Sequence, residues 1–179
     1  ALDKGEDLSL RTKGGQIDLP RMFEGGLDVQ FFSCFVHPRY LEHNEAIKRA
    51  LRMIDAVKQL AAKAPERLEI AKSAAEIRRI VGMGKVAGVL CIEGGHAIED
   101  DLGVLRLFHE LGVRYMTLTW NNTNNWADGC GGPPRHNGLT DFGRQVVREM
   151  NRLGMMVDIS HVSEKSFYDA LEVSKDPVI

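Results

Sequence analysis

Two ionisable side chains follow short runs that favour β-strands, at the points where those runs end. Glu93 comes directly after residues 86–92, and His161 comes directly after residues 155–160. If both runs are parallel strands, their carboxyl ends lie at one edge of a sheet, where the reactive groups of α/β proteins gather. A carboxylate oxygen and an imidazole nitrogen that meet there are ligands suited to Zn²⁺. The two residues are therefore the leading candidates for a metal site.

The alternation of side chains along a strand gives both candidates a direction. Cys91 and Glu93 fall on one side of the first run, and Ile159 and His161 fall on one side of the second. If those sides face the same space, the carboxylate and the imidazole converge. The alternative is that each of the two is a solvated loop residue or a helix cap. Two ligands are also fewer than the three protein ligands usual for catalytic zinc.

The segments that must position these residues alternate between strand-like and helix-like patterns. Strands are expected over residues 28–36, 86–92, 113–119 and 155–160, with one more beginning at 177–179. Apolar periodicity and capping residues predict helices over residues 42–64, 73–82, 99–111 and 140–153, and a further helix capped by Ser163. A loop dense in Asn, Gly and Pro spans residues 121–138. The alternation predicts a parallel sheet covered by helices.

Two α/β architectures fit this order: an open doubly wound sheet and a TIM (β/α)8 barrel. No G-x-G-x-x-G follows a strand, which disfavours a dinucleotide-binding sheet. The 179 residues provide about five strands, whereas a complete barrel typically takes ~250 residues. We therefore expect residues 1–179 to be an incomplete segment of one longer barrel domain, lacking the first strand and the C-terminal strands.

Composition gives no support to several classes of partner. The formal net charge of −2 and the pI near 6.3 give no electrostatic reason to expect nucleic acid or an anionic membrane. No run approaches the ~18 consecutive apolar residues of a transmembrane segment. The three cysteines, Cys34, Cys91 and Cys130, are too few and too far apart for a disulfide framework. The expectation is a soluble globular protein, with a cytoplasmic, periplasmic or secreted location left open.

Long motifs along the chain resemble a known family of peptidases. They are residues 92–96 (IEGGH), 111–119 (LGVRYMTLT), 126–128 (WAD), 138–154 and 156–163, with Asp18-Leu19-Pro20 and Gly25-Gly26 near the start. These segments resemble the renal (membrane) dipeptidase family, a peptidase branch of the amidohydrolase-like barrels. The resemblance covers nearly the whole chain. It implies that residues 1–179 are part of a metal-dependent hydrolase barrel.

The resemblance also implies roles for the two candidate ligands. Glu93 corresponds to the carboxylate that bridges two zinc ions, and His161 corresponds to a histidine ligand of one of them. The family's His-x-Asp ligand pair would precede Ala1, and a further histidine would follow Ile179. The implied reaction is zinc-dependent hydrolysis of small dipeptides by a metal-bridging hydroxide, with Glu93 as a catalytic residue. The isolated segment is then expected to be inactive. Homodimers are common among relatives, so a homodimer is one expected assembly.

One position departs from the family pattern. Well-known members carry a histidine after Leu-Thr, thought to contact the substrate carbonyl or the tetrahedral intermediate, and this chain has Trp120 there. An indole N–H donates one hydrogen bond but cannot exchange protons. Either Asn121 or Asn122 supplies a donor, or the substrate preference differs. Trp120 and Asn121 are therefore candidate substrate-binding residues. The alternatives are another metal-dependent amidohydrolase, such as a deacylase or lactonase, and a non-catalytic relative.

Other polar residues have mainly structural interpretations. His96 either orients Glu93 or belongs to a loop, and His136 is a candidate for lining the cleft. Trp126 and Asp128 are expected to anchor the long loop. Cys130 has no evident histidine partner and is not expected to act as a nucleophile.

Overall fold

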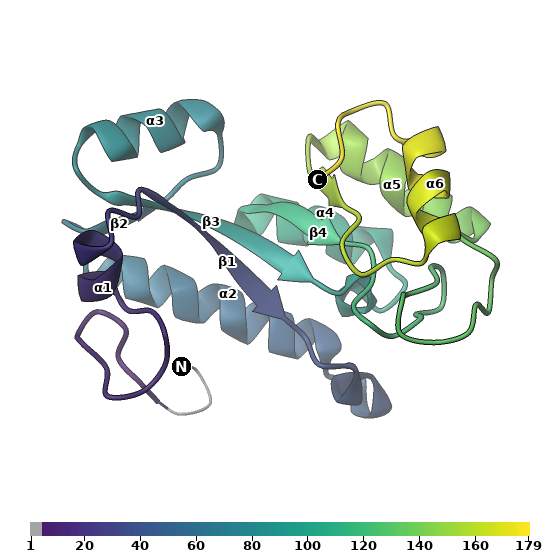
Figure 1. The fold of residues 1–179 in the computed structure, drawn as a ribbon, viewed down its shortest axis with the longest axis horizontal. Coiled ribbons are helices and arrows are strands. Elements are labelled where there is room, and N and C mark those ends of the chain that lie inside the picture. The colour runs from purple at the N-terminus through teal and green to yellow at the C-terminus, as the bar shows by residue number, and fades with distance from the viewer. Residues whose placement is uncertain (1–4) are drawn as a thin grey trace. The chain divides into compact units, whose positions relative to one another are not determined.

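The computed structural model describes residues 5–179, which form an α/β fold (Figure 1). The strands are β1 (Val29–Phe35), β2 (Leu68–Ile70), β3 (Val86–Glu93), β4 (Val113–Thr117) and β5 (Met156–Asp158). The α-helices are α1 (Leu19–Glu24), α2 (Ala46–Lys63), α3 (Ala74–Gly82), α4 (Leu102–Leu111), α5 (Asp141–Leu153) and α6 (Glu164–Val173). Two 3-10 helices, η2 (Pro38–His43) and η3 (Gly95–Ile98), complete the order.

The strands form one sheet in the order β1-β3-β4-β5, with β2 also paired to β3. The β2–β3 pair is parallel, with Leu68 opposite Val86. The β4–β5 pair is also parallel, with Thr117 opposite Asp158. β3 is buried along its length until Glu93, as expected for a continuous apolar run. The predicted parallel sheet with intervening helices is therefore confirmed.

Capping residues set the helix ends where the sequence predicted them. The hydroxyl of Ser73 accepts a hydrogen bond from the Glu76 N–H at the start of α3, and Thr140 accepts one from the Gly143 N–H at the start of α5. At the other ends, Gly112 closes α4 with φ 112°. That left-handed conformation is open to glycine at little cost.

Several element boundaries differ from the prediction. The helix expected from residue 99 begins at Leu102, because residues 95–98 form η3 and Asp101 caps α4. The strands expected to end at residues 119 and 160 end at Thr117 and Asp158. The sequence patterns also missed α1 and β2, which are too short to show a period.

The strand expected at residues 177–179 is not formed as a regular element, but its pairing is present. The Ile179 N–H donates to the Val157 carbonyl at 3.0 Å, and the Ile159 N–H donates to the Ile179 carbonyl at 2.9 Å. These two bonds on either side of residue 158 are the pattern of a parallel ladder. Residue 179 therefore extends the hydrogen bonding on the free side of β5.

The chain divides into two compact units. The first comprises the residues up to Phe32 with Leu51–Leu90, and the second comprises Ser33–Ala50 with Cys91–Ile179. In the first unit, one core cluster contains Leu19, Met22, Leu68 and Val86, and another contains Ala71, Ile80, Ala87 and Val89. In the second unit, α5 packs against α4, α6 and β5, and Figure 1 shows α5 and α6 side by side.

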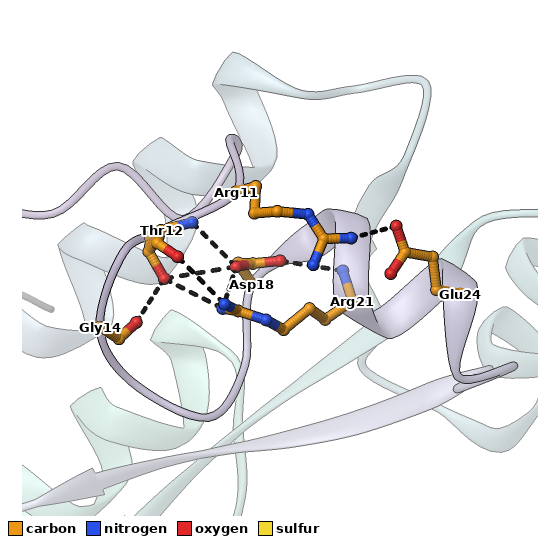
Figure 2. Close-up of polar contacts among 6 residues, drawn as sticks. All are labelled: Arg11, Thr12, Gly14, Asp18, Arg21 and Glu24. Atoms are coloured by element: carbon orange, nitrogen blue, oxygen red, sulfur yellow. Dashed lines mark hydrogen bonds and ion pairs between the residues drawn. The ribbon is translucent and has the colours of Figure 1, made fainter.

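A buried carboxylate organises the beginning of the first unit. Asp18 caps α1 by accepting the Arg21 N–H, and it also accepts the Thr12 N–H at 3.0 Å. The Arg21 guanidinium forms an ion pair with the same carboxylate, and Arg11 pairs with Glu24 nearby (Figure 2). Burial opposes ionisation of Asp18, but these donors outweigh it and hold the pKa of the carboxyl below its usual value. The Asp-Leu-Pro segment thus ties the preceding loop to α1.

Among residues 5–179, no helix combines the length and the apolar character that crossing a membrane requires.

Candidate functional site

Glu93 is the last residue of β3 and the first partly exposed residue after seven buried ones. Its Oε2 accepts a hydrogen bond from the Ser33 hydroxyl at 2.8 Å. Its Oε1 lies 3.6 Å from Nε2 of His161. The Glu93 carbonyl accepts the Val36 N–H at 3.4 Å, which joins the end of β1 to the end of β3. The structure therefore brings the two predicted site residues together. One oxygen of the Glu93 carboxylate faces Ser33, and the other faces His161.

A fixed turn after β5 presents His161. The strand ends at Asp158, and His161 has φ 63°, in the left-handed region that L-residues rarely adopt. Its carbonyl accepts the Cys130 N–H at 2.8 Å and the Thr119 hydroxyl at 3.0 Å. Such a conformation persists where surrounding contacts determine it. These two bonds supply that constraint.

The prediction that strand alternation directs His161 was wrong, although His161 does meet Glu93. Thr117 and Asp158 are opposite each other in the β4–β5 register, and the Thr117 hydroxyl donates to the Asp158 carboxylate. Asp158 therefore shares a face with Thr117 and with Tyr115, whose side chain bonds to Cys91 on the Glu93 side of β3. Ile159 has the opposite parity to Asp158, so it lies on the other face. His161 reaches Glu93 because the chain turns after Asp158. The Asp158 carboxylate supports this turn by accepting the Ser160 N–H at 2.9 Å.

Asn121 determines which nitrogen of His161 faces Glu93. The His161 Nδ1 lies 3.0 Å from Oδ1 of Asn121. With the amide oxygen assigned to this contact, Nδ1 carries the hydrogen and donates it, since a carbonyl oxygen can only accept. In the neutral imidazole, Nε2 then carries the free lone pair, on the side of Glu93. A histidine ligand of a metal is commonly oriented in this way.

The donor set fits part of a metal site. Glu93 and His161 offer an oxygen and a nitrogen donor at the edge of the sheet, both partly exposed. Within the part of the chain that the structure describes, no group of three or more His, Cys, Asp and Glu side chains is placed to hold an ion. The described residues therefore bring together two donors, which is fewer than a catalytic zinc site usually takes from protein.

Two buried thiols of the second unit are poor nucleophiles. Cys34 and Cys91 are almost fully buried, and burial raises the pKa of each thiol to about 12. Tyr115 hydrogen-bonds to Cys91, and burial together with that bond raises the pKa of its hydroxyl well above the usual value. These groups stay protonated and uncharged near neutral pH, so they supply no nucleophile.

Asp128 anchors the long loop, as the sequence predicted. Its carboxylate accepts the N–H groups of Arg135 at 2.8 Å, His136 at 3.1 Å and Gly138 at 2.9 Å. Burial opposes ionisation, but these donors outweigh it and hold the pKa of the carboxyl below its usual value. Trp126 is 1% exposed and forms part of the core. His136 bonds through Nε2 to the Asn124 carbonyl at 2.9 Å, so its ring is held within the loop.

Replacing Asp128 with Ala is expected to destabilise the protein by about 2–3 kcal/mol, because it leaves the buried N–H of Gly138 and two partly buried N–H groups without an acceptor. Urea unfolding at neutral pH measures this change. The matched control is Asp141→Ala on the exposed start of α5, where the cap is supplied by Thr140 and the effect should stay below about 1 kcal/mol. Equal effects of the two substitutions would contradict the anchoring role.

His96 contacts the backbone next to Glu93 and not Glu93 itself. It is 2% exposed, and its Nε2 lies 2.7 Å from the Val36 carbonyl. Burial lowers the pKa of the imidazole, which favours the neutral ring with Nε2–H as the donor. Since the Val36 N–H bonds to the Glu93 carbonyl, His96 and Glu93 hold the same residue of the neighbouring segment.

Trp120 lies in a group of rings. Its ring centroid is 5.0 Å from that of Phe35 and 5.9 Å from that of His37, both in tilted arrangements. Trp120 is half-buried, in contrast to Trp126. Sequence reasoning missed Phe35 and Ser33 as members of the site. The available signal was Ser33, a polar residue between the apolar residues Phe32 and Cys34 of β1.

Comparisons with known proteins agree with one another. Residues 2–179 match the family model of membrane dipeptidases (peptidase family M19). Dipeptidase 3 of Mus musculus is 40% identical over 180 residues, covering 97% of this chain and 36% of the mouse protein. The chain thus spans little more than a third of that relative's length.

Two solved structures share the fold. A metallo peptidase from Rhodobacter sphaeroides, liganded with a phosphinate mimic of the dipeptide L-Ala-D-Ala, is 33% identical with a TM-score of 0.83, covering 96% of this chain and 57% of that one. The probable dipeptidase PvdM from Pseudomonas aeruginosa is 26% identical with a TM-score of 0.92, covering 99% of this chain and 48% of that one.

Proposed function

Because this chain belongs to the membrane dipeptidase family, we propose that its protein is a zinc-dependent peptidase that hydrolyses dipeptides on a TIM barrel. The observation that carries the proposal is the convergence of Glu93, at the end of β3, and His161, in the turn after β5, 3.6 Å apart. The same family match and the dipeptide mimic bound to the Rhodobacter structure support a dipeptide as the substrate class.

Glu93 and His161 are the residues of this chain that would hold zinc. Two bound ions would supply an activated water and polarise the scissile carbonyl. Ser33 holds one oxygen of Glu93, which leaves the other directed at His161. A carboxylate whose two oxygens are separately directed is suited to bridging two cations and reducing their mutual repulsion.

The direct test uses full-length protein supplied with zinc. Expected results are hydrolysis of dipeptides and bound zinc of about two ions per chain. N-acyl amino acids and lactones belong in the same panel, since Trp120 in place of a histidine keeps a deacylase or lactonase as the second candidate. Hydrolysis of those compounds without dipeptide turnover would reject the proposal. A folded protein that binds no zinc would identify a non-catalytic relative.

Asn121 is proposed to orient His161 and to lie on the substrate side of the site beside Trp120. The substitution Asn121→Ala removes the acceptor of the Nδ1–H and should weaken zinc affinity by about 10–100-fold. Asn121→Asp keeps an acceptor in place and is the conservative control. Competition with a zinc chelator measures both. Unchanged zinc affinity in Asn121→Ala would contradict the orienting role.

A further inference from the structure

We propose that Phe35, His37 and Trp120 form an aromatic wall that selects dipeptides with a large apolar side chain. This inference rests on the proposed dipeptidase function and adds a substrate preference to it. The three residues are called the aromatic wall below.

The position of Phe35 follows from its strand. Ser33 directs its hydroxyl to the Glu93 carboxylate, and Phe35 lies two residues further along β1, on the same face. The Val36 N–H bonds to the Glu93 carbonyl, so the end of β1 runs beside the end of β3. Phe35 is therefore next to the carboxylate at the carboxyl end of the sheet.

Trp120 connects this position to the imidazole. It follows β4, and its ring is tilted 58° to that of Phe35 at a centroid distance of 5.0 Å. The next residue, Asn121, bonds to His161. The backbone of residues 120–121 thus holds an aromatic ring on one side and the orienting amide of His161 on the other. The third ring, His37, is fixed because its Nδ1 accepts the Arg39 N–H at 3.2 Å.

The exposure of the rings separates the aromatic wall from ordinary core packing. Trp126 is fully buried against its neighbours, whereas Trp120 and Phe35 are half-buried and His37 is exposed. Apolar ring surface thus remains open to solvent beside a polar pair. Covering it with an apolar side chain of the substrate removes that surface from water, and ring edges and faces favour aromatic partners.

The chemistry of position 120 points the same way. Indole has one N–H donor, no acceptor and no protonated form in the working pH range. It can bind an apolar group or donate a single hydrogen bond, but it cannot carry a proton during the reaction. The exposed face of its ring is therefore suited to contact with an apolar side chain of the substrate.

The test measures kcat/KM of full-length, zinc-loaded protein for glycyl-glycine, phenylalanyl-glycine and glycyl-phenylalanine. The wild type should prefer one of the two phenylalanine-containing substrates. The substitution Trp120→Ala should lower the ratio of kcat/KM for that substrate to kcat/KM for glycyl-glycine by about tenfold or more. Phe167→Ala, which truncates a partly exposed ring on α6, is the matched control and should leave all three values unchanged.

A uniform fall for all three substrates in Trp120→Ala, or a wild type that prefers glycyl-glycine, would overturn the aromatic wall. Trp120→Phe keeps a ring and should retain most of the preference, which guards against misfolding of the alanine variant. Binding is read separately from tryptophan fluorescence on adding phenylalanyl-glycine. If the fluorescence change seen in the wild type is lost in Trp120→Phe, the aromatic wall is supported. If the wild type and Trp120→Phe give the same fluorescence change, the aromatic wall is rejected. Absence of any turnover in the wild type rejects the proposed function, while the fluorescence result still decides the wall.

Discussion

Full-length protein carrying Glu93→Gln is expected to lose at least about 10³-fold in kcat and to bind less zinc than the wild type. Glutamine has the same shape, and its amide oxygen can still accept the Ser33 hydroxyl. It lacks the negative charge that would offset two cations, and a metal held there would supply several kcal/mol of transition-state stabilisation. Steady-state kinetics and metal analysis by mass spectrometry measure the two effects.

The control for this substitution is Glu149→Gln. Glu149 lies on α5 and pairs with Arg106 and Arg152, and those pairs lower the pKa of its carboxyl to about 2. Removing its charge disturbs a salt bridge away from Glu93 and should leave kcat and zinc content unchanged. If Glu93→Gln kept both activity and zinc, Glu93 would not be a metal ligand.

The largest effect on stability is expected from Gly95→Ala. A Cβ at residue 95 would lie 2.5 Å from the Leu118 carbonyl oxygen and 2.5 Å from the Trp126 ring. Neither can move freely, because Leu118 follows β4 and Trp126 is buried in the core. Overpacking of this kind costs about 3 kcal/mol. Urea unfolding should show that loss.

The control is Gly82→Ala at the end of α3, where an added Cβ meets nothing within 4 Å. Alanine in a helix is favoured over glycine by up to about 1 kcal/mol, so this variant should be at least as stable as the wild type. Similar destabilisation of the two variants would show that the close approach of Leu118 and Trp126 is not the reason why residue 95 is a glycine.

The elements that could be predicted from sequence are those with a repeated local signal. α2 and α5 have apolar residues at helical spacing, and β3 is a continuous apolar run. β2 has only three residues, which is too few to show a period, and it exists because β3 offers a partner. Its formation depends on a contact between segments far apart in sequence.

The site residues also divide into those with a local sequence signal and those placed by contacts between distant segments. The ends of the predicted strands pointed to Glu93 and His161, but the direction of His161 depends on the turn after Asp158. That turn is held by Thr119 and Cys130, which precede it by some 30–40 residues. Ser33 bonds to Glu93 across 60 positions. No local pattern encodes such pairs. Alternation therefore led to the correct expectation that His161 meets Glu93, but for the wrong reason.

The way the long loop is attached has a consequence for variation in chain length. Asn121 and Cys130 each bond to His161, and Asp128 binds the backbone again at Arg135. Between these fixed points, residues 132–134 form an exposed tip, and a side chain at Gly132 would meet nothing within 4 Å. Insertions are tolerated where backbone is exposed and makes few bonds. The tip is therefore where the chain can lengthen, or receive a label, while the imidazole keeps its place.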